Sequence, residues 1–221
     1  MDDNEKNSLF VSHFTIDEEM LYLYQCINVL LPNATTKVLQ FISSCKGEGT
    51  TTIVRELAKT VALTMEKIVL VIDANRSNLN QDSYSHIKKV DYGWEKVIKE
   101  GKSLDGAIYH VKNMSLYVSP ISKDPDKQSY IFDTYEIRNF LEKLRQRFDI
   151  ILIDSPPVTV SYDGLNFCSA VDGIIIVLEA DKTQWNVAKS AKKNILKNGG
   201  KILGIVFNKK QNYIPRLFPE M

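Results

Sequence analysis

The ten residues SSCKGEGTTT, numbers 43–52, decide the fold of this chain. They come close to the phosphate-binding pattern G-x-x-x-x-G-K-[ST], in which glycines let backbone N–H groups surround phosphate oxygens and a lysine reaches the terminal phosphates. On this template Ser44 takes the place of the first glycine, Gly49 that of the second, and Thr51 that of the Mg²⁺-binding hydroxyl. Thr50 stands where the lysine belongs. The stretch therefore predicts a phosphate-binding loop that lacks its usual cation.

Short apolar runs and segments of helical periodicity alternate around this loop. Six nearly continuous apolar runs are typical of strands that are covered on both faces: KVLQFISS, KIVLVID, MSLYVSP, FDIILID, DGIIIVLEA and KILGIVFN. Helical spacing follows the loop and returns in TYEIRNFLEKLRQR and TQWNVAKSAKKNILKNGG. The order predicts a doubly wound α/β fold, with a mostly parallel sheet flanked by helices. We expect residues 1–35 to form an N-terminal extension with an amphipathic helix, and residues 36–221 to form the P-loop α/β domain.

Composition narrows the classes of function. The 221 residues carry 28 basic and 27 acidic side chains, and this balance argues against a nucleic-acid partner. No apolar run approaches the roughly 20 residues that a membrane-spanning helix needs. Three scattered cysteines suggest neither a metal site nor a disulfide framework, which favours a reduced, cytosolic chain. The charged side chains of the first twenty residues are mostly acidic, and those from Lys182 onward are mostly basic, so these ends are either solvated or meet a charged partner.

Two carboxylates accompany the loop. Asp73 ends the run KIVLVID, and Asp154 ends the run FDIILID. Because ligands of doubly wound sheets bind outside the carboxyl ends of the strands, we expect both aspartates to lie near the loop. Carboxylates and the Thr51 hydroxyl are hard oxygen ligands that suit Mg²⁺, and Thr52 can offer a hydroxyl to a phosphate. The sequence thus predicts a Mg²⁺–nucleotide site at this edge, with Thr51, Asp73 and Asp154 as metal ligands.

Five segments resemble the successive motifs of one family: SSCKGEGTTTIVRELA, VLVIDANRSN, DIILIDSPPV, DGIIIVLEADKT and GKILGIVFNKK. They look like the bacterial tyrosine kinases (BY-kinases) of the CpsD/CapB type, within the MinD/ParA-like P-loop superfamily. The resemblance runs from about residue 17 to about residue 215. It implies ATP or ADP with Mg²⁺ as cofactors. It also implies a cytoplasmic protein, peripheral at the inner face of the bacterial cell membrane. There the partner would be a Wzz-type polysaccharide co-polymerase of capsular or exopolysaccharide assembly.

The resemblance also assigns roles to single residues. Asp73 matches the acid that is held to accept the tyrosine proton, and Asp154 matches the Walker B aspartate, so both are predicted as catalytic. Asn208 matches an asparagine that contacts adenine. Arg76 follows a strand end near the predicted site, and the resemblance supports a contact with the phosphates. The predicted cofactor-binding residues are Lys46, Gly47, Glu48, Gly49, Thr50, Thr51, Thr52, Arg76 and Asn208.

Four parts of the kinase pattern are altered. Thr50 replaces the lysine that neutralises the β- and γ-phosphates, and Asn75 replaces the second acid of the family's D-x-D-x-R motif. Tyr22 and Gln25 replace both arginines of the ring-forming motif E-x-x-R-x-x-R. In place of a C-terminal tyrosine cluster, the last fifty residues contain only Tyr213. These changes together predict a protein that keeps the fold while phosphoryl transfer is weak or lost.

Two other functions stay open at this point. One is an active protein-tyrosine autokinase or ATPase that depends on Mg·ATP. The other is a MinD/ParA-like positioning ATPase, which is disfavoured because Cys45 stands where those proteins carry their signature lysine. Self-association into a homo-oligomer is the alternative to docking on a co-polymerase.

Overall fold

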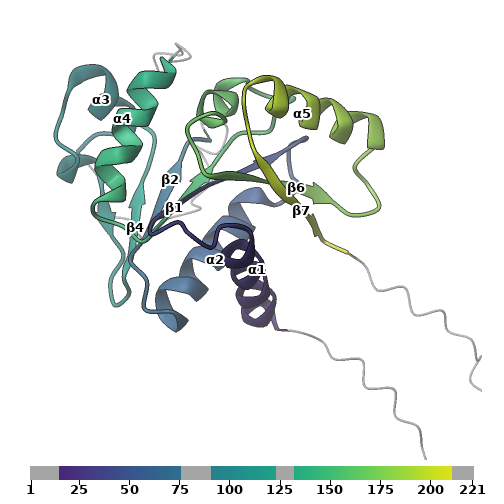
Figure 1. Cartoon of the computed structure of the whole chain (residues 1–221), viewed down its shortest axis with the longest axis horizontal. Helices are drawn as coiled ribbons and strands as arrows, with labels where there is room; N and C mark the ends of the chain where they lie inside the picture. The colour runs from purple at the N-terminus through teal and green to yellow at the C-terminus, as the bar shows by residue number, and fades with distance from the viewer. Residues whose placement is uncertain (1–14, 76–90, 123–131, 211–221) are drawn as a thin grey trace, which may run out of the picture.

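A sheet of seven strands lies at the centre of the part of the chain that the computed structural model describes, residues 15–75, 91–122 and 132–210 (Figure 1). The strands are β1 (Lys37–Ser43), β2 (Val69–Asp73), β3 (Tyr109–His110), β4 (Leu116–Ser119), β5 (Ile150–Asp154), β6 (Gly173–Glu179) and β7 (Ile202–Asn208). Their order across the sheet is β3-β4-β2-β5-β1-β6-β7. All neighbours are parallel except the antiparallel pair β3 and β4. The predicted doubly wound fold is confirmed.

Helices cover both faces of this sheet. The α-helices are α1 (Ile16–Leu30), α2 (Thr50–Thr64), α3 (Trp94–Glu100), α4 (Thr134–Arg145) and α5 (Trp185–Lys197). Helices α1 and α2 lie on one side, and α3, α4 and α5 lie on the other (Figure 1). Two short 3₁₀ turns lie in the connections: Asp105–Ala107 between α3 and β3, and Asp163–Phe167 between β5 and β6. Both faces of the central strands are therefore buried.

The central strands supply successive residues to opposite cores. Val38 packs in the core under α4, while its neighbour Leu39 packs in the core under α1 and α2. In the same way, Leu70 packs in the core under α4 and Val71 packs in the core under α1 and α2. All four side chains are almost completely buried. This two-sided burial is the physical reason why the strands are continuous apolar runs rather than alternating ones.

Helix α1 forms within the predicted N-terminal extension. A capping box starts it, in which the Thr15 hydroxyl accepts the Glu18 N–H and the Glu18 carboxylate accepts the Thr15 N–H. Its buried residues, Met20, Tyr24 and Ile27, recur at helical spacing and pack in one core with α2. The expected helix is present, whereas the division of the chain at residue 35 stays a prediction.

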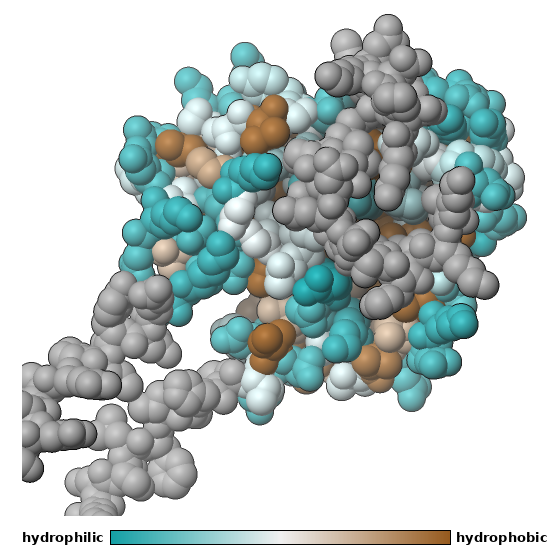
Figure 2. Space-filling model, turned by 180° about the vertical axis from the view of Figure 1, so that it is seen from behind, coloured by the Kyte–Doolittle hydropathy of each residue, from teal (hydrophilic) through white to brown (hydrophobic). Residues whose placement is uncertain are grey.

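Hydrophilic and hydrophobic residues are mixed on the side of the surface seen in Figure 2. There, the hydrophobic residues outside the grey atoms lie as isolated spots among hydrophilic side chains (Figure 2). Across the described residues, each helix is either too short or too polar to span a bilayer.

Candidate nucleotide-binding site

The loop between β1 and α2 turns at two glycines. Gly47 has φ +89° and Gly49 has φ +91°, a left-handed conformation that side chains disfavour. Gly49 also lies against Asn208, and a Cβ at this position would collide with the Asn208 side-chain amide. Helix α2 begins directly after Gly49, so its first N–H groups and its positive dipole end lie at the loop. This geometry suits an anion.

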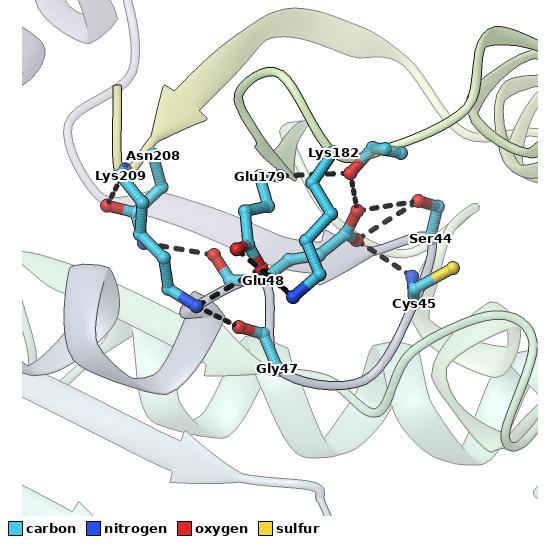
Figure 3. A network of polar contacts seen from close by, with 9 residues as sticks. Ser44, Cys45, Gly47, Glu48, Glu179, Lys182, Asn208 and Lys209 are labelled. Carbon is cyan, nitrogen blue, oxygen red and sulfur yellow. Dashed lines mark hydrogen bonds and ion pairs between the residues drawn. The ribbon is translucent and has the colours of Figure 1, made fainter. Parts of the chain in front are cut away.

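A buried carboxylate holds the loop from inside. Glu48 is 2% exposed, and its carboxylate accepts hydrogen bonds from the Ser44 hydroxyl (3.0 Å) and the Cys45 N–H (2.8 Å) (Figure 3). The hydroxyl of Thr183, from the turn between β6 and α5, also donates to it. The Thr183 hydroxyl therefore serves the loop, and the N-cap of α5 is the next residue, Gln184. The Glu48 side chain fixes the loop, and its backbone is the part that we expect to face a phosphate.

The end of β7 forms a second clamp on the loop. The Asn208 side-chain amide donates to the Glu48 carbonyl (2.9 Å), and the Lys209 ammonium donates to the Gly47 carbonyl (2.7 Å) (Figure 3). Lys209 also pairs with Glu179 at the end of β6 (3.2 Å), and this lysine lowers the pKa of the Glu179 carboxyl. The resemblance assigned Asn208 to adenine. In the structure its amide contacts the loop.

The position of the missing lysine is buried and uncharged. Thr50 is 6% exposed, and its hydroxyl has no hydrogen-bond partner among the described residues. Lys46 is exposed on the same loop, and Lys182 pairs with Glu179 (3.2 Å). Neither lysine is hydrogen-bonded to the loop backbone in the described part of the chain, whereas Lys209 is. The cation that contacts the loop thus comes from the end of β7.

The two predicted aspartates come together at the sheet edge. Asp73 and Asp154 are register partners at the ends of the neighbouring parallel strands β2 and β5, and β1 with its loop lies on the other side of β5. The Ala74 N–H donates to the Asp154 carbonyl (2.9 Å). The Asp73 carboxylate accepts the Asn75 N–H (3.0 Å). The buried Trp94 indole donates to the Asp73 carbonyl (2.9 Å) and fixes the backbone there.

Burial makes this carboxylate pair hard to ionise. Burial raises the pKa of Asp154 well above its ordinary range, the Asp73 charge raises it further, and the Thr51 hydroxyl lowers it. The pKa of Asp73 is raised to about 6, chiefly by burial, while the hydrogen bond from Asn75 opposes the rise. A divalent cation would relieve this repulsion. Two carboxylates and a threonine hydroxyl are the donor set that Mg²⁺ uses together with phosphate oxygens and water.

The remaining predicted residues lie in different surroundings. Thr51 is half-buried and Thr52 is exposed in the first turn of α2. Arg76 lies outside the described residues. A groove of about 340 Å³ lies beside the loop, between residues 158–162 and α5, and it is lined by none of the predicted residues. It touches the loop through Thr159, whose hydroxyl donates to the Ser44 carbonyl (2.7 Å).

The raised pKa values predict how ligand-free stability depends on pH. Both folded-state pKa values exceed the unfolded value of 3.8, so the stability that the protonated carboxyls contribute is fully present below this pH. It is lost as pH rises, through about 6 for Asp73 and through the raised pKa of Asp154. We expect Asp154→Asn to unfold at a Tm roughly 5 °C above wild type at pH 7.5, and this difference should shrink as the pH is lowered toward about 4. Thermal unfolding followed by circular dichroism measures this.

Asp181→Asn is the matched control, because Asp181 is exposed and asparagine tolerates its left-handed φ of +58°. Added Mg²⁺ should narrow the difference between wild type and Asp154→Asn. Parallel curves of Tm against pH for these two proteins would contradict the assignment.

The loop, the helix start and the paired strand-end carboxylates define the class of protein, a P-loop nucleotide-binding fold. A family model for the AAA domain matches residues 36–199, and the chain belongs to this family. Tyrosine-protein kinase CpsD of Streptococcus agalactiae is 26% identical over 182 residues, which cover 82% of this chain and 79% of the relative. Tyrosine-protein kinase CpsD of Streptococcus pneumoniae is 23% identical over 191 residues, which cover 86% of this chain and 84% of the relative. The resemblance to bacterial tyrosine kinases is confirmed.

Solved structures share the fold. The kinase domain of the Escherichia coli tyrosine kinase ETK superposes with a TM-score of 0.74 at 15% identity, over 89% of this chain and 77% of that one. The septum site-determining protein MinD of Pyrococcus horikoshii, solved with Mg-ADP, gives a TM-score of 0.62 at 22% identity, over 78% of this chain and 70% of that one. At these identities the similarities show the shared fold alone.

Proposed function

We propose that this protein is a tyrosine-kinase-like P-loop protein that binds Mg²⁺ and ATP or ADP, and whose phosphoryl transfer is weak or lost. The observation that carries the proposal is the convergence of the glycine loop, Asp73 and Asp154 at one sheet edge, with Thr50 in the lysine position. Thr51, Asp73 and Asp154 would hold the metal ion. When bound, Mg²⁺ would supply positive charge beside the phosphate oxygens.

The loop geometry supports nucleotide binding without the lysine. The Glu48 carboxylate accepts hydrogen bonds from Ser44 and Cys45 within the loop, and Lys209 donates to the Gly47 carbonyl from the end of β7. We expect these contacts to order the loop backbone before a ligand arrives. A preorganised loop avoids part of the entropy cost of binding. The helix dipole and the N–H groups at the start of α2 would supply the attraction for phosphate to which a lysine otherwise contributes.

Similarity to named relatives supports a proposal for the cellular role. We propose that the protein acts at the inner face of the cell membrane, where it regulates a Wzz-type co-polymerase of capsular or exopolysaccharide assembly. The support is the similarity to kinases named CpsD and to the solved chimerical protein CapA2B2, which matches with a TM-score of 0.70. A homo-oligomer is the competing arrangement. Analytical ultracentrifugation with and without the cytosolic segment of a co-polymerase would separate the two.

A nucleotide titration tests the site directly. Calorimetry should show Mg·ADP binding to wild type, with weaker binding when Mg²⁺ is left out. Gly49→Ala should weaken binding at least tenfold, because its Cβ would collide with Asn208 and its φ of +91° is strained.

Gly101→Ala is the matched control. Gly101 also has a positive φ, of +65°, but open space surrounds its Cβ position, and it lies at the end of α3. We expect its affinity to equal that of wild type. Equal affinities for Gly49→Ala and wild type would show that nucleotide, if bound, does not lie on this loop.

A further inference from the structure

Helix α5 presents a basic and apolar surface to solvent. Its buried residues Ala191 and Ile195 face the sheet, and Trp185, Lys189 and Leu196 recur at helical spacing on the opposite side. Trp185 is 78% exposed and Leu196 is 52% exposed. Figure 1 shows α5 as the outer layer above β6 and β7. An exposed tryptophan and an exposed leucine therefore flank a lysine on the outer surface of one helix.

The edge strand β7 extends this surface. Ile205 and Phe207 are register partners of Ile176 and Leu178, which pack in the core beneath α5. Paired residues of parallel strands point to the same face, so Ile205 and Phe207 lie on the α5 side of the sheet. They are 45% and 63% exposed, because β7 lies beyond the cover of the helix. We call Trp185, Lys189, Lys192, Lys193, Leu196, Ile205 and Phe207 together the α5–β7 face.

The charge of the α5–β7 face has one sign. Residues 182–210 contain no acid and no arginine. They contain eight lysines: Lys182, Lys189, Lys192, Lys193, Lys197, Lys201, Lys209 and Lys210. Lys182 and Lys209 pair with Glu179. Within the described ranges, Lys189, Lys192 and Lys193 form no ion pair, so their charge is not neutralised by the fold.

We propose that the α5–β7 face docks on an anionic lipid surface. Lysines interspersed with exposed Trp, Phe and Leu are the composition of interfacial segments that combine headgroup attraction with shallow burial of apolar side chains. The absence of arginine favours a diffuse lipid charge over an acidic protein segment, because arginine is the side chain that recognises carboxylates through paired hydrogen bonds. The docking rests on the location at the membrane face proposed above. It needs neither bound nucleotide nor phosphoryl transfer, so it can fail while nucleotide binding stands.

Cosedimentation of the purified full chain with vesicles tests this docking. Wild type should bind vesicles of equal parts phosphatidylglycerol and phosphatidylcholine, should not bind phosphatidylcholine alone, and should dissociate as salt rises. The triple variant Lys189→Glu, Lys192→Glu and Lys193→Glu should bind about a hundredfold more weakly. Its unfolding temperature should stay unchanged, because all three lysines are exposed.

A second triple variant controls for net charge. Lys59→Glu, Lys67→Glu and Lys112→Glu change the same number of charges at exposed positions of other elements, and this protein should bind vesicles like wild type within a fewfold. Trp185→Ala and Phe207→Ala should each weaken binding by roughly fivefold to tenfold through lost apolar burial.

Three results would overturn the proposal. The first is no binding of wild type to anionic vesicles at low salt. The second is equal loss of binding in both triple variants, which would reduce the effect to net charge. The third is a wild type that binds soluble polyglutamate but no vesicles, while the α5 triple variant binds neither. This result would assign the α5–β7 face to an acidic protein partner.

Discussion

Purified wild-type protein incubated with Mg·ATP is expected to carry tyrosine phosphate at a level several orders of magnitude below that of the Streptococcus agalactiae relative under the same conditions. Phosphoryl transfer depends on positioning and on stabilising the charge that spreads over the transferred group. The position that supplies a cation in the loop pattern is a buried, neutral threonine here, Thr50. The lysine that does contact the loop, Lys209, is bound to a carbonyl and to Glu179.

Thr50→Lys alone is not expected to restore full activity. It would return one charge to the loop, but Asn75 would still replace the second acid, and residues 172–221 would still contain a single tyrosine, Tyr213. We expect this variant to bind nucleotide more tightly while autophosphorylation stays low. The double variant Thr50→Lys, Asn75→Asp, supplied with a tyrosine-containing polymer as acceptor, should give the largest transfer. Thr64→Lys makes the same substitution at an exposed position at the other end of α2 and should change neither nucleotide affinity nor autophosphorylation.

Mass spectrometry of the purified protein distinguishes the outcomes. Stoichiometric phosphotyrosine on the wild type would show that the chain is an active autokinase and that another group replaces the loop lysine. Phosphate that appears with Thr50→Lys alone would show that Asn75 and the missing tyrosines do not limit transfer.

Much of this arrangement could be predicted because it depends on local patterns. Strands buried on both faces produce continuous apolar runs in the sequence. The glycine loop precedes a helical segment, and Asp73 and Asp154 end two such runs, so both could be expected at the sheet edge beside the loop. The two-residue strand β3 could not be predicted, because two residues carry no periodicity. The structure placed Asp73 and Asp154 in register, while their roles and those of the loop residues stay predictions.

The contacts that hold the loop were beyond sequence reasoning for a different reason. Glu48 could be recognised only as a loop residue, because its partner Thr183 lies 135 positions away and sheet order alone brings the two together. The sequence contained a weak indication that Lys209 lies near the loop, because it directly follows Asn208 at a strand end of the same sheet edge. A threonine hydroxyl such as that of Thr183 can cap a helix or form a hydrogen bond with a residue distant in the sequence. Only the packed fold decides between them.

The indole of Trp94 connects the core under α3 and α4 to the site, so its removal should have a large effect on both. Trp94 is 2% exposed and packs against Phe132, Phe140 and Phe167, with ring centroids 5.2, 6.1 and 5.5 Å away. Trp94→Ala is expected to lower the free energy of unfolding by about 3–5 kcal/mol, through lost burial and the cavity that remains. Chemical denaturation measures this.

A conservative variant separates the structural role of Trp94 from its effect on the site. Trp94→Phe keeps most of the packing but removes the indole N–H that donates to the Asp73 carbonyl, 2.9 Å away. We expect a smaller loss of stability, about 1–2 kcal/mol, together with a weaker dependence of nucleotide affinity on Mg²⁺, because the backbone that carries Asp73 loses its anchor. Trp185→Ala is the control, since Trp185 is 78% exposed and its removal should leave stability unchanged within about 0.5 kcal/mol. If Trp94→Phe kept the Mg²⁺ dependence of wild type while its stability fell, Trp94 would serve the core alone.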